Sequence, residues 1–182
     1  MKLTGNLIIA PPSVTKKFWR ETVIMITEHH TDGSIGLILN KPSTVSIADL
    51  GDQLDIELDL PGLVFIGGPI NTTSISVLHS NDWVTDNTYQ INDQFSLSSS
   101  EEMLTRLTNG DTPKQWRMFV GMCGWDKTQL IAEIAGTPPY NHNTSWCTAT
   151  ANLALAFDHT NIEQWKLAIV QSSIDFAQNL LT

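Results

Sequence analysis

Two apolar segments joined by a tight turn constrain the fold of this chain more than any other feature. Residues Thr22–Glu28 (TVIMITE) are dense in β-branched side chains, which is typical of a buried strand. Asp32–Gly33 is a hairpin turn signal, and Ser34–Asn40 (SIGLILN) predicts the returning strand. Strands joined by so short a turn pair antiparallel, so the chain begins an antiparallel sheet close to its N-terminus.

Other short segments predict the remaining elements. Apolar runs predict strands at Leu7–Ala10, Ile75–Leu78, Tyr89–Leu97, Trp116–Met122 and Trp146–Thr150. The alternation of acidic and aliphatic residues in Asp55–Leu60 predicts a strand or an extended edge. Capping residues predict helices at Ile47–Leu54 after Ser46, from the Ser98/Glu101 capping box to about Thr108, at Lys127–Ala135 between Asp126 and Gly136, and from Thr160 or Asn161 onward. The last helix carries Ile162, Trp165, Ile169 and Phe176 on one apolar stripe, and Pro138–Asn143 reads as a polar loop.

The order of these elements predicts an α+β fold. Strands and helices are mixed without the regular alternation that builds a parallel sheet, so the sheet is mostly antiparallel. Many short strands favour a closed or strongly coiled sheet over a flat one. The chain has 182 residues and no recognisable linker, which predicts a single domain over 1–182.

The distribution of charge excludes some partners. The net charge is −9, and the stretch from Pro42 to Thr105 contains no lysine or arginine. The acids of that stretch are Asp49, Asp52, Asp55, Glu57, Asp59, Asp82, Asp86, Asp93, Glu101 and Glu102. Such a field repels phosphate, which argues against nucleic acid and anionic membranes as partners. A basic protein partner or a cation would be tolerated, although a solubilising surface explains the same acids.

The cellular location is predicted to be the cytoplasm. The chain has only two cysteines, Cys123 and Cys147, which is typical of a protein in a reducing compartment. The apolar patch Leu7–Ala10 is too short for a signal peptide, and no apolar run approaches the length of a membrane-spanning helix.

Several turn-rich motifs resemble the YqgE/AlgH family of small bacterial proteins. They are Gly5 with Leu7–Ala10 and Pro12, Glu28–His29, Gly33, Gly36, Asn40–Pro42, Gly67–Gly68–Pro69, Leu78–His79, Gly121, Gly124–Trp125 and Gln129–Leu130 with Glu133–Ile134. The chain departs from the family at Cys123, where a small Ala or Ser is usual. The resemblance implies an α+β fold in which coiled antiparallel strands form a pseudo-barrel flanked by helices. It implies no established activity; one branch carries the label of a transcriptional regulator, without a recognisable DNA-binding motif.

Five polar or aromatic residues are candidates for one pocket: Glu28, His29, Asn40, His79 and Trp125. A carboxylate beside an imidazole can act as a general base or bind metal, but neighbouring strand residues point to opposite faces. Strand-end hydrogen bonding is the favoured interpretation of Glu28 and His29, and a structural histidine is the favoured interpretation of His79. Trp125 is either a core anchor or a pocket wall.

Cys123 and the glycines favour structural roles. A thiol near a helix start can be nucleophilic, but a small buried cysteine is the favoured interpretation of Cys123. Gly67–Gly68–Pro69 lacks the spacing of a phosphate-binding loop and reads as a tight turn. No catalytic triad, metal-ligand cluster or cofactor motif is present, so we expect no catalytic residues, no metal and no cofactor.

Two functions from different classes remain open. The favoured one is a non-catalytic binding or regulatory module with a protein or small-molecule partner. The alternative is a hydrolase or transferase that uses Glu28 with His29 or His79. Direct DNA binding ranks last, because Lys16, Lys17 and Arg20 are the only basic cluster.

Overall fold

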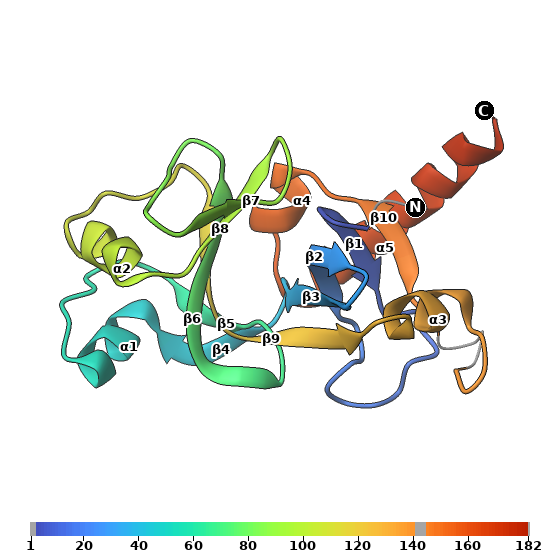
Figure 1. The fold of residues 1–182 in the computed structure, drawn as a ribbon, viewed down its shortest axis with the longest axis horizontal. Coiled ribbons are helices and arrows are strands. Elements are labelled where there is room, and N and C mark those ends of the chain that lie inside the picture. Colours follow the sequence, from blue (N-terminus) through green and yellow to red (C-terminus); the bar gives the residue numbers. More distant parts are fainter. Residues whose placement is uncertain (1–2, 141–144, 182) are drawn as a thin grey trace.

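The computed structural model describes residues 3–140 and 145–181, and within them it contains ten strands and five helices. The strands form one strongly curled, mostly antiparallel sheet with helices packed around it, which confirms the predicted α+β class (Figure 1). The strand order is β10-β1-β2-β3-β9-β6-β8-β7; β4 pairs with β5, and β5 pairs with β9 in parallel.

The strands are β1 (Asn6–Ile9), β2 (Val23–His30), β3 (Gly33–Ile38), β4 (Pro42–Ser46), β5 (Leu63–Ile66), β6 (Ile70–Ser80), β7 (Thr88–Gln90), β8 (Phe95–Ser98), β9 (Trp116–Asp126) and β10 (Cys147–Thr150). The helices are α1 (Ile47–Leu54), α2 (Glu101–Thr108), α3 (Gln129–Ala135), α4 (Leu153–Phe157) and α5 (Asn161–Leu180). As predicted, β2 and β3 form an antiparallel hairpin.

Strand β9 joins the two halves of the sheet. Its first residues, 116–120, pair with β6, and its last residues, 123–126, pair with β3. Gly121 lies between these parts with φ +73°, and a Cβ at this position would lie 2.4 Å from the carbonyl oxygen of Gly68. Only glycine satisfies both conditions, so Gly121 lets the strand change partners while it crosses the Gly67–Gly68 segment between β5 and β6. The Gly67–Gly68 segment is thus a point of close backbone approach.

Three apolar clusters fill the space around the sheet. One lies between β1, β2, β3 and the helices α4 and α5, and it includes Phe95 and Phe119. A second lies beneath α3 and contains Ile8, Ile24 and Trp125. The third packs α1 and α2 onto β6 and the first half of β9. Figure 1 shows α1 and α2 at one end of the molecule and α3 at the other.

The observed helix boundaries show which of the predicted capping residues do cap a helix. Ser46 caps α1 as predicted, because its side chain accepts from the Asp49 amide in a capping box. The predicted helix ending near Thr108 is confirmed as α2, but the predicted cap was wrong: Ser98 ends β8, and Ser100 caps the helix. Asp126 does not cap α3, because β9 continues through it and the helix begins at Gln129. Gly136 ends α3 in the left-handed region, as predicted.

Two predicted strands differ from the structure. The run Tyr89–Leu97 divides into β7 and β8, because Asn92 Oδ1 accepts from the amides of Gln94 and Phe95 and turns the chain. Asp55–Leu60 forms no strand, although its acids are exposed and Leu58 is buried, as the alternation indicated. The short helix α4 was not predicted. The polar loop Pro138–Asn143 lies partly outside the described residues.

Helix α5 is only partly covered by the body of the protein. Trp165 and Ile169 of the predicted stripe pack on the core, whereas Ile162 and Phe176 are 46% and 67% exposed. The predicted apolar stripe is therefore only partly buried, and Figure 1 shows the C-terminal turns of α5, which include Phe176, extending past the sheet. Among the described residues, no helix combines the length and apolarity needed to cross a membrane.

Candidate functional site

Two neighbouring pockets lie at the C-terminal end of β9. The first, which we call the aromatic pocket, has a volume of about 430 Å³ and the second, the hairpin pocket, about 630 Å³. They share the lining residues Ile70, Gly124, Trp125 and Gln129. The aromatic pocket adds Lys16, Trp19, Glu133, Tyr140 and Trp146 among others, and the hairpin pocket adds Glu28, His30, Asp32, Ser34 and Asp126.

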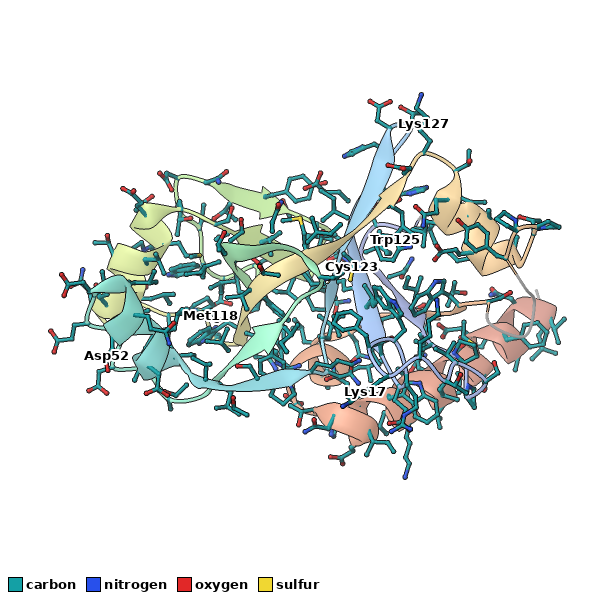
Figure 2. All side chains as sticks on the ribbon, turned by 90° about the horizontal axis from the view of Figure 1, so that it is seen from below. Lys17, Asp52, Met118, Cys123, Trp125 and Lys127 are labelled. Carbon is teal, nitrogen blue, oxygen red and sulfur yellow. The ribbon has the colours of Figure 1, made fainter. Side chains whose placement is uncertain are left out.

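Trp125 is both a core anchor and a pocket wall. It is 7% exposed, packs in the apolar cluster beneath α3, and lines both pockets. Figure 2 shows Cys123 and Trp125 near the middle of the molecule, with Trp125 on the side of β9 that faces α3 and far from Asp52 in α1. The exposed Gly124 beside it carries no side chain, which leaves the surface of the strand open to both pockets.

The carboxylate of Glu133 organises the aromatic pocket. Its Oε2 accepts from the indole Nε1–H of Trp125 at 3.0 Å and of Trp146 at 2.8 Å, and its Oε1 accepts from Gln129 Nε2 at 2.8 Å. Each donor is neutral, so hydrogen bonding orients the carboxylate without cancelling its charge. In the chain outside residues 1–2, 141–144 and 182, no cationic group lies within ion-pair distance of Glu133.

The other aromatic walls come from distant parts of the chain. Trp19 belongs to the connector between β1 and β2, and its ring meets that of Trp146 edge to face at 6.1 Å. Phe18 packs edge to face on Trp19 at 4.8 Å, and Lys41 lies over the Phe18 ring. Sequence reasoning missed Trp19, Glu133 and Trp146 as site residues. The sequence did contain one indication of this site, which is the tryptophan Trp19 in a connector. A large apolar ring in a loop needs a packing partner, so its presence there indicates a contact with another segment.

The cysteine of the aromatic pocket lining is buried and held as a thiol. Cys123 is 1% exposed, and burial raises the pKa of its thiol to about 12. Its Sγ lies 3.5 Å from the carbonyl oxygen of Gly67, which the S–H can reach as a weak donor. Since the thiolate is the reactive form, the structure supports the small buried cysteine that the sequence favoured.

The hairpin pocket holds the histidine–carboxylate pair of the β2–β3 turn. Glu28 and His30 lie 3.7 Å apart, nitrogen to oxygen, at the exposed end of the hairpin. His29 points elsewhere: its Nδ1 lies 2.7 Å from Ser34 Oγ, and Ser34 lines the pocket while being 3% exposed. Within the described part of the chain, no group of three or more His, Cys, Asp or Glu side chains is arranged to hold a metal ion.

Asn40 is buried and serves as a cross-link. Its Oδ1 accepts from the Val23 amide, and its Nδ2 donates to the carbonyl oxygens of Glu21 and Asn161. These bonds connect the start of β2 to the first residue of α5. The hydrogen bonds of this connection engage both the oxygen and the nitrogen of the Asn40 amide. Asn40 lines neither pocket.

His79 is fully buried in the other half of the sheet. Its Nδ1 lies 2.8 Å from the Ser80 carbonyl oxygen, which can only accept, so Nδ1 carries the proton and Nε2 accepts from Ser98 Oγ at 2.9 Å. Burial lowers the pKa of the imidazole, and the Trp83 ring packs edge to face on it at 5.2 Å. The neutral ring therefore holds β6 to β8.

Of the five sequence candidates, the structure brings Glu28 and Trp125 into one pocket lining. His29 reaches that lining only through Ser34, while Asn40 and His79 lie away from both pockets. The site that emerges is a pair of connected cavities in an α+β half-barrel, with a carboxylate held by two indoles. The protein is thus a curled α+β half-barrel that carries a preformed cavity with one oriented carboxylate.

Comparison with known proteins places the chain in a family. The AlgH-like family model matches residues 7–177, and the chain belongs to that family. A UPF0301 protein of Marinomonas sp. strain MWYL1 is 33% identical over 178 residues, covering 96% of this chain and 91% of the relative. A UPF0301 protein of Shewanella denitrificans is 32% identical, with 97% and 94% covered.

Solved structures share the fold. The solution structure of the AlgH protein from Pseudomonas aeruginosa superposes with a TM-score of 0.75 and 26% identity, over 93% of this chain and 88% of that one. A crystal structure of the Corynebacterium diphtheriae protein DIP2367 gives a TM-score of 0.70 at 22% identity, over 91% and 84% of the two chains, and shows the same fold. The relatives' names state no activity.

Proposed function

We propose that this protein is a non-catalytic binding module whose ligand is a small molecule held in the aromatic pocket. The observation that carries the proposal is the Glu133 carboxylate, oriented by two indole donors inside a cavity of about 430 Å³. Small-molecule sites are commonly cavities of about 300–1,000 Å³ with mostly apolar walls and a few oriented polar groups. A regulatory role would follow from occupancy of this pocket.

The chemistry around the pocket supports binding over turnover. The Cys123 thiol is held protonated by burial, and the histidine of the distant half, His79, is enclosed and hydrogen-bonded at both nitrogens. The Glu133 carboxylate already accepts three hydrogen bonds. It is therefore better suited to position a ligand as a hydrogen-bond acceptor than to act as a base that takes a proton from a substrate.

A filled-pocket variant tests this function. Gly124 lines both cavities, its φ is compatible with a side chain, and a Cβ there meets only the flexible end of Ile70, at 3.1 Å. Gly124→Leu should therefore fold and occupy the cavity. We expect compounds from a metabolite library to shift the indole resonances of Trp125 and Trp146 in the wild type and not in Gly124→Leu. The control Thr73→Leu, on an exposed part of β6, should bind as the wild type does.

The proposal would be abandoned if compounds bound equally well to wild type and Gly124→Leu, or if a broad substrate panel revealed steady turnover that Gly124→Leu abolished. The first result would put the binding surface elsewhere, and the second would make the cavity an active site.

A second candidate function rests on the hydrogen bond between His29 and Ser34. At 2.7 Å, Nδ1 of the neutral tautomer without a proton there would accept from the Ser34 hydroxyl, as a general base does, and Ser34 lines the hairpin pocket with Glu28. Esterase activity that disappears in both Ser34→Ala and His29→Ala would support a hydrolase. Covalent labelling by a fluorophosphonate probe at any other serine, unaffected by these changes, would refute it.

A further inference from the structure

We infer that the aromatic pocket selects a small organic cation, an alkylated ammonium group, over neutral and anionic molecules of the same shape. This inference names the ligand class and rests on the proposed binding function. It depends on the charge inside the pocket, the nature of its walls and the charge around its entrance.

The carboxylate in the pocket lining is negative, and no cation of residues 3–140 and 145–181 lies within ion-pair distance of it. Glu133 is fixed by Trp125, Trp146 and Gln129, all of which are neutral donors. The ion pairs found among residues 3–140 and 145–181 involve other carboxylates. A carboxylate in a partly desolvated cavity attracts a cation more strongly than it would in water, and it repels an anion equally.

Four aromatic side chains contribute to the largely apolar walls of the pocket. Trp19, Trp125, Tyr140 and Trp146 come from four separate segments and converge on the same cavity. Tryptophan faces attract ammonium groups through their quadrupole, and cavities that combine several such rings are the common way to bind alkylated ammonium. An alkylated ammonium also suits apolar walls, because its methyl groups need no hydrogen-bond acceptors.

Carboxylates of the adjoining hairpin pocket extend the negative field. Glu28, Asp32 and Asp126 line that pocket, which shares Gly124 and Trp125 with the aromatic one. His30 lies near Glu28 and offsets part of this charge only when protonated. Lys16 is the cation among the described lining residues of the aromatic pocket, and it is exposed to solvent, where screening weakens its repulsion. The balance favours the approach of cations.

A comparison of three molecules of one shape tests the inference. Choline is the cationic probe, 3,3-dimethylbutan-1-ol replaces its nitrogen by carbon, and 3,3-dimethylbutanoate carries a negative charge. Titrations follow the indole Nε1–H resonances of Trp125 and Trp146, which report contact at Glu133 directly. We expect choline to shift both resonances at concentrations about tenfold lower than the neutral alcohol, and the carboxylate to have no effect.

Charge variants separate the carboxylate from general effects. Glu133→Gln keeps an oxygen acceptor for the indoles and removes the charge, so we expect it to weaken choline binding about tenfold and leave the alcohol unchanged. Glu57→Gln removes one charge from an exposed position outside both pockets and should bind choline as the wild type does. Lys16→Gln should strengthen choline binding, and salt should reduce this gain.

Each alternative outcome is decisive. Equal or tighter binding of the neutral or anionic molecule at the same indoles overturns the inference and leaves the proposed binding function standing. Indole resonances that respond to none of the three molecules also overturn the inference, and the library titration against Gly124→Leu then decides the binding function separately. If Glu133→Gln does not fold, the wild-type comparison of the three probes gives the answer alone. A bound free ammonium ligand and the same group on a peptide are distinguished by repeating the titration with a trimethyllysine peptide.

Discussion

The indole nitrogen of Trp146 donates to Glu133 Oε2 over 2.8 Å, and this bond joins helix α3 to the chain entering the edge strand β10. Because Trp125 of β9 donates to the same oxygen, one carboxylate fixes the relative positions of three elements. The packing of the pocket and its chemistry therefore depend on the same group.

The first prediction concerns that group. Glu133→Ala leaves both indole donors and the Gln129 amide without their acceptor, and each partly buried donor that loses its partner costs about 1–3 kcal/mol. We expect Glu133→Ala to lower the free energy of unfolding by about 2–4 kcal/mol, and Glu133→Gln by less than half of that loss. Urea denaturation followed by tryptophan fluorescence measures both. An alanine variant as stable as the wild type would show that the indoles find water instead.

The second prediction concerns the glycine at which β9 changes partners. Gly121 and Gly110 have nearly the same φ, +73° and +74°, but a Cβ at Gly121 lies 2.4 Å from the Gly68 carbonyl oxygen, whereas nothing lies within 4 Å at Gly110. Gly110→Ala should cost about 1 kcal/mol, from the left-handed backbone alone. Gly121→Ala should cost about 3 kcal/mol or more, because backbone atoms must also move.

Thermal and urea unfolding of the two alanine variants measures both losses of stability. The difference between them is the steric cost, because the cost of the left-handed backbone is common to both. Equal losses in the two variants would contradict the close approach of the Gly67–Gly68 segment to β9.

The third prediction concerns the buried histidine. Burial lowers the pKa of His79 below its ordinary value of 6.5, so the unfolded chain takes up a proton before the folded chain does. Above that ordinary value both states are neutral and pH has no effect through this group. As pH falls below it the unfolded state is favoured, and stability is lost until the pKa of the folded state is passed.

Replacing His79 by Asn, which offers both a donor and an acceptor, should therefore flatten the fall in unfolding free energy between about pH 6.5 and pH 5. The matched variant His30→Asn, at the exposed hairpin end, should keep the fall. The measurement is urea denaturation at a series of pH values. A His79→Asn curve parallel to the wild-type curve would contradict the assignment of a neutral imidazole.

The fourth prediction concerns thiol reactivity. Burial raises the pKa of Cys123 to about 12, so at pH 8 the folded protein presents almost no thiolate at this position. We expect iodoacetamide to label Cys123 only at the rate of unfolding, and rapidly in guanidinium chloride. Mass spectrometry of the labelled peptides, in a Cys147→Ser background, measures the rate. Fast labelling of the native protein would contradict the burial.

Local signals made part of the fold predictable. The β2–β3 hairpin followed from β-branched residues on both sides of Asp32–Gly33, and α1 followed from the Ser46 cap, because these preferences act over a few neighbouring residues. The cap of α2 was not predictable in this way. Ser98 was predicted as the cap, but its pairing with Val77 in the sheet commits it to β8, and Ser100 caps the helix instead.

The candidate site was less predictable than the fold. Glu28 and Trp125 were identified from residue type and position, and they do line a common pocket. Asn40 and His79 have the same chemical character, but burial and hydrogen bonding fully engage their side chains. A sequence gives the type of a side chain and not whether its hydrogen-bonding capacity is already used.

The amino-acid sequence by itself determined the family, the α+β class and the hairpin, since turn residues, caps and β-branched runs act locally. The tertiary structure alone decided that Trp19, Glu133 and Trp146 meet in one cavity. Residues so far apart in the chain come together only through the strand order of the curled sheet. That order arises from the burial of apolar surface over the whole molecule, and no local sequence pattern encodes it.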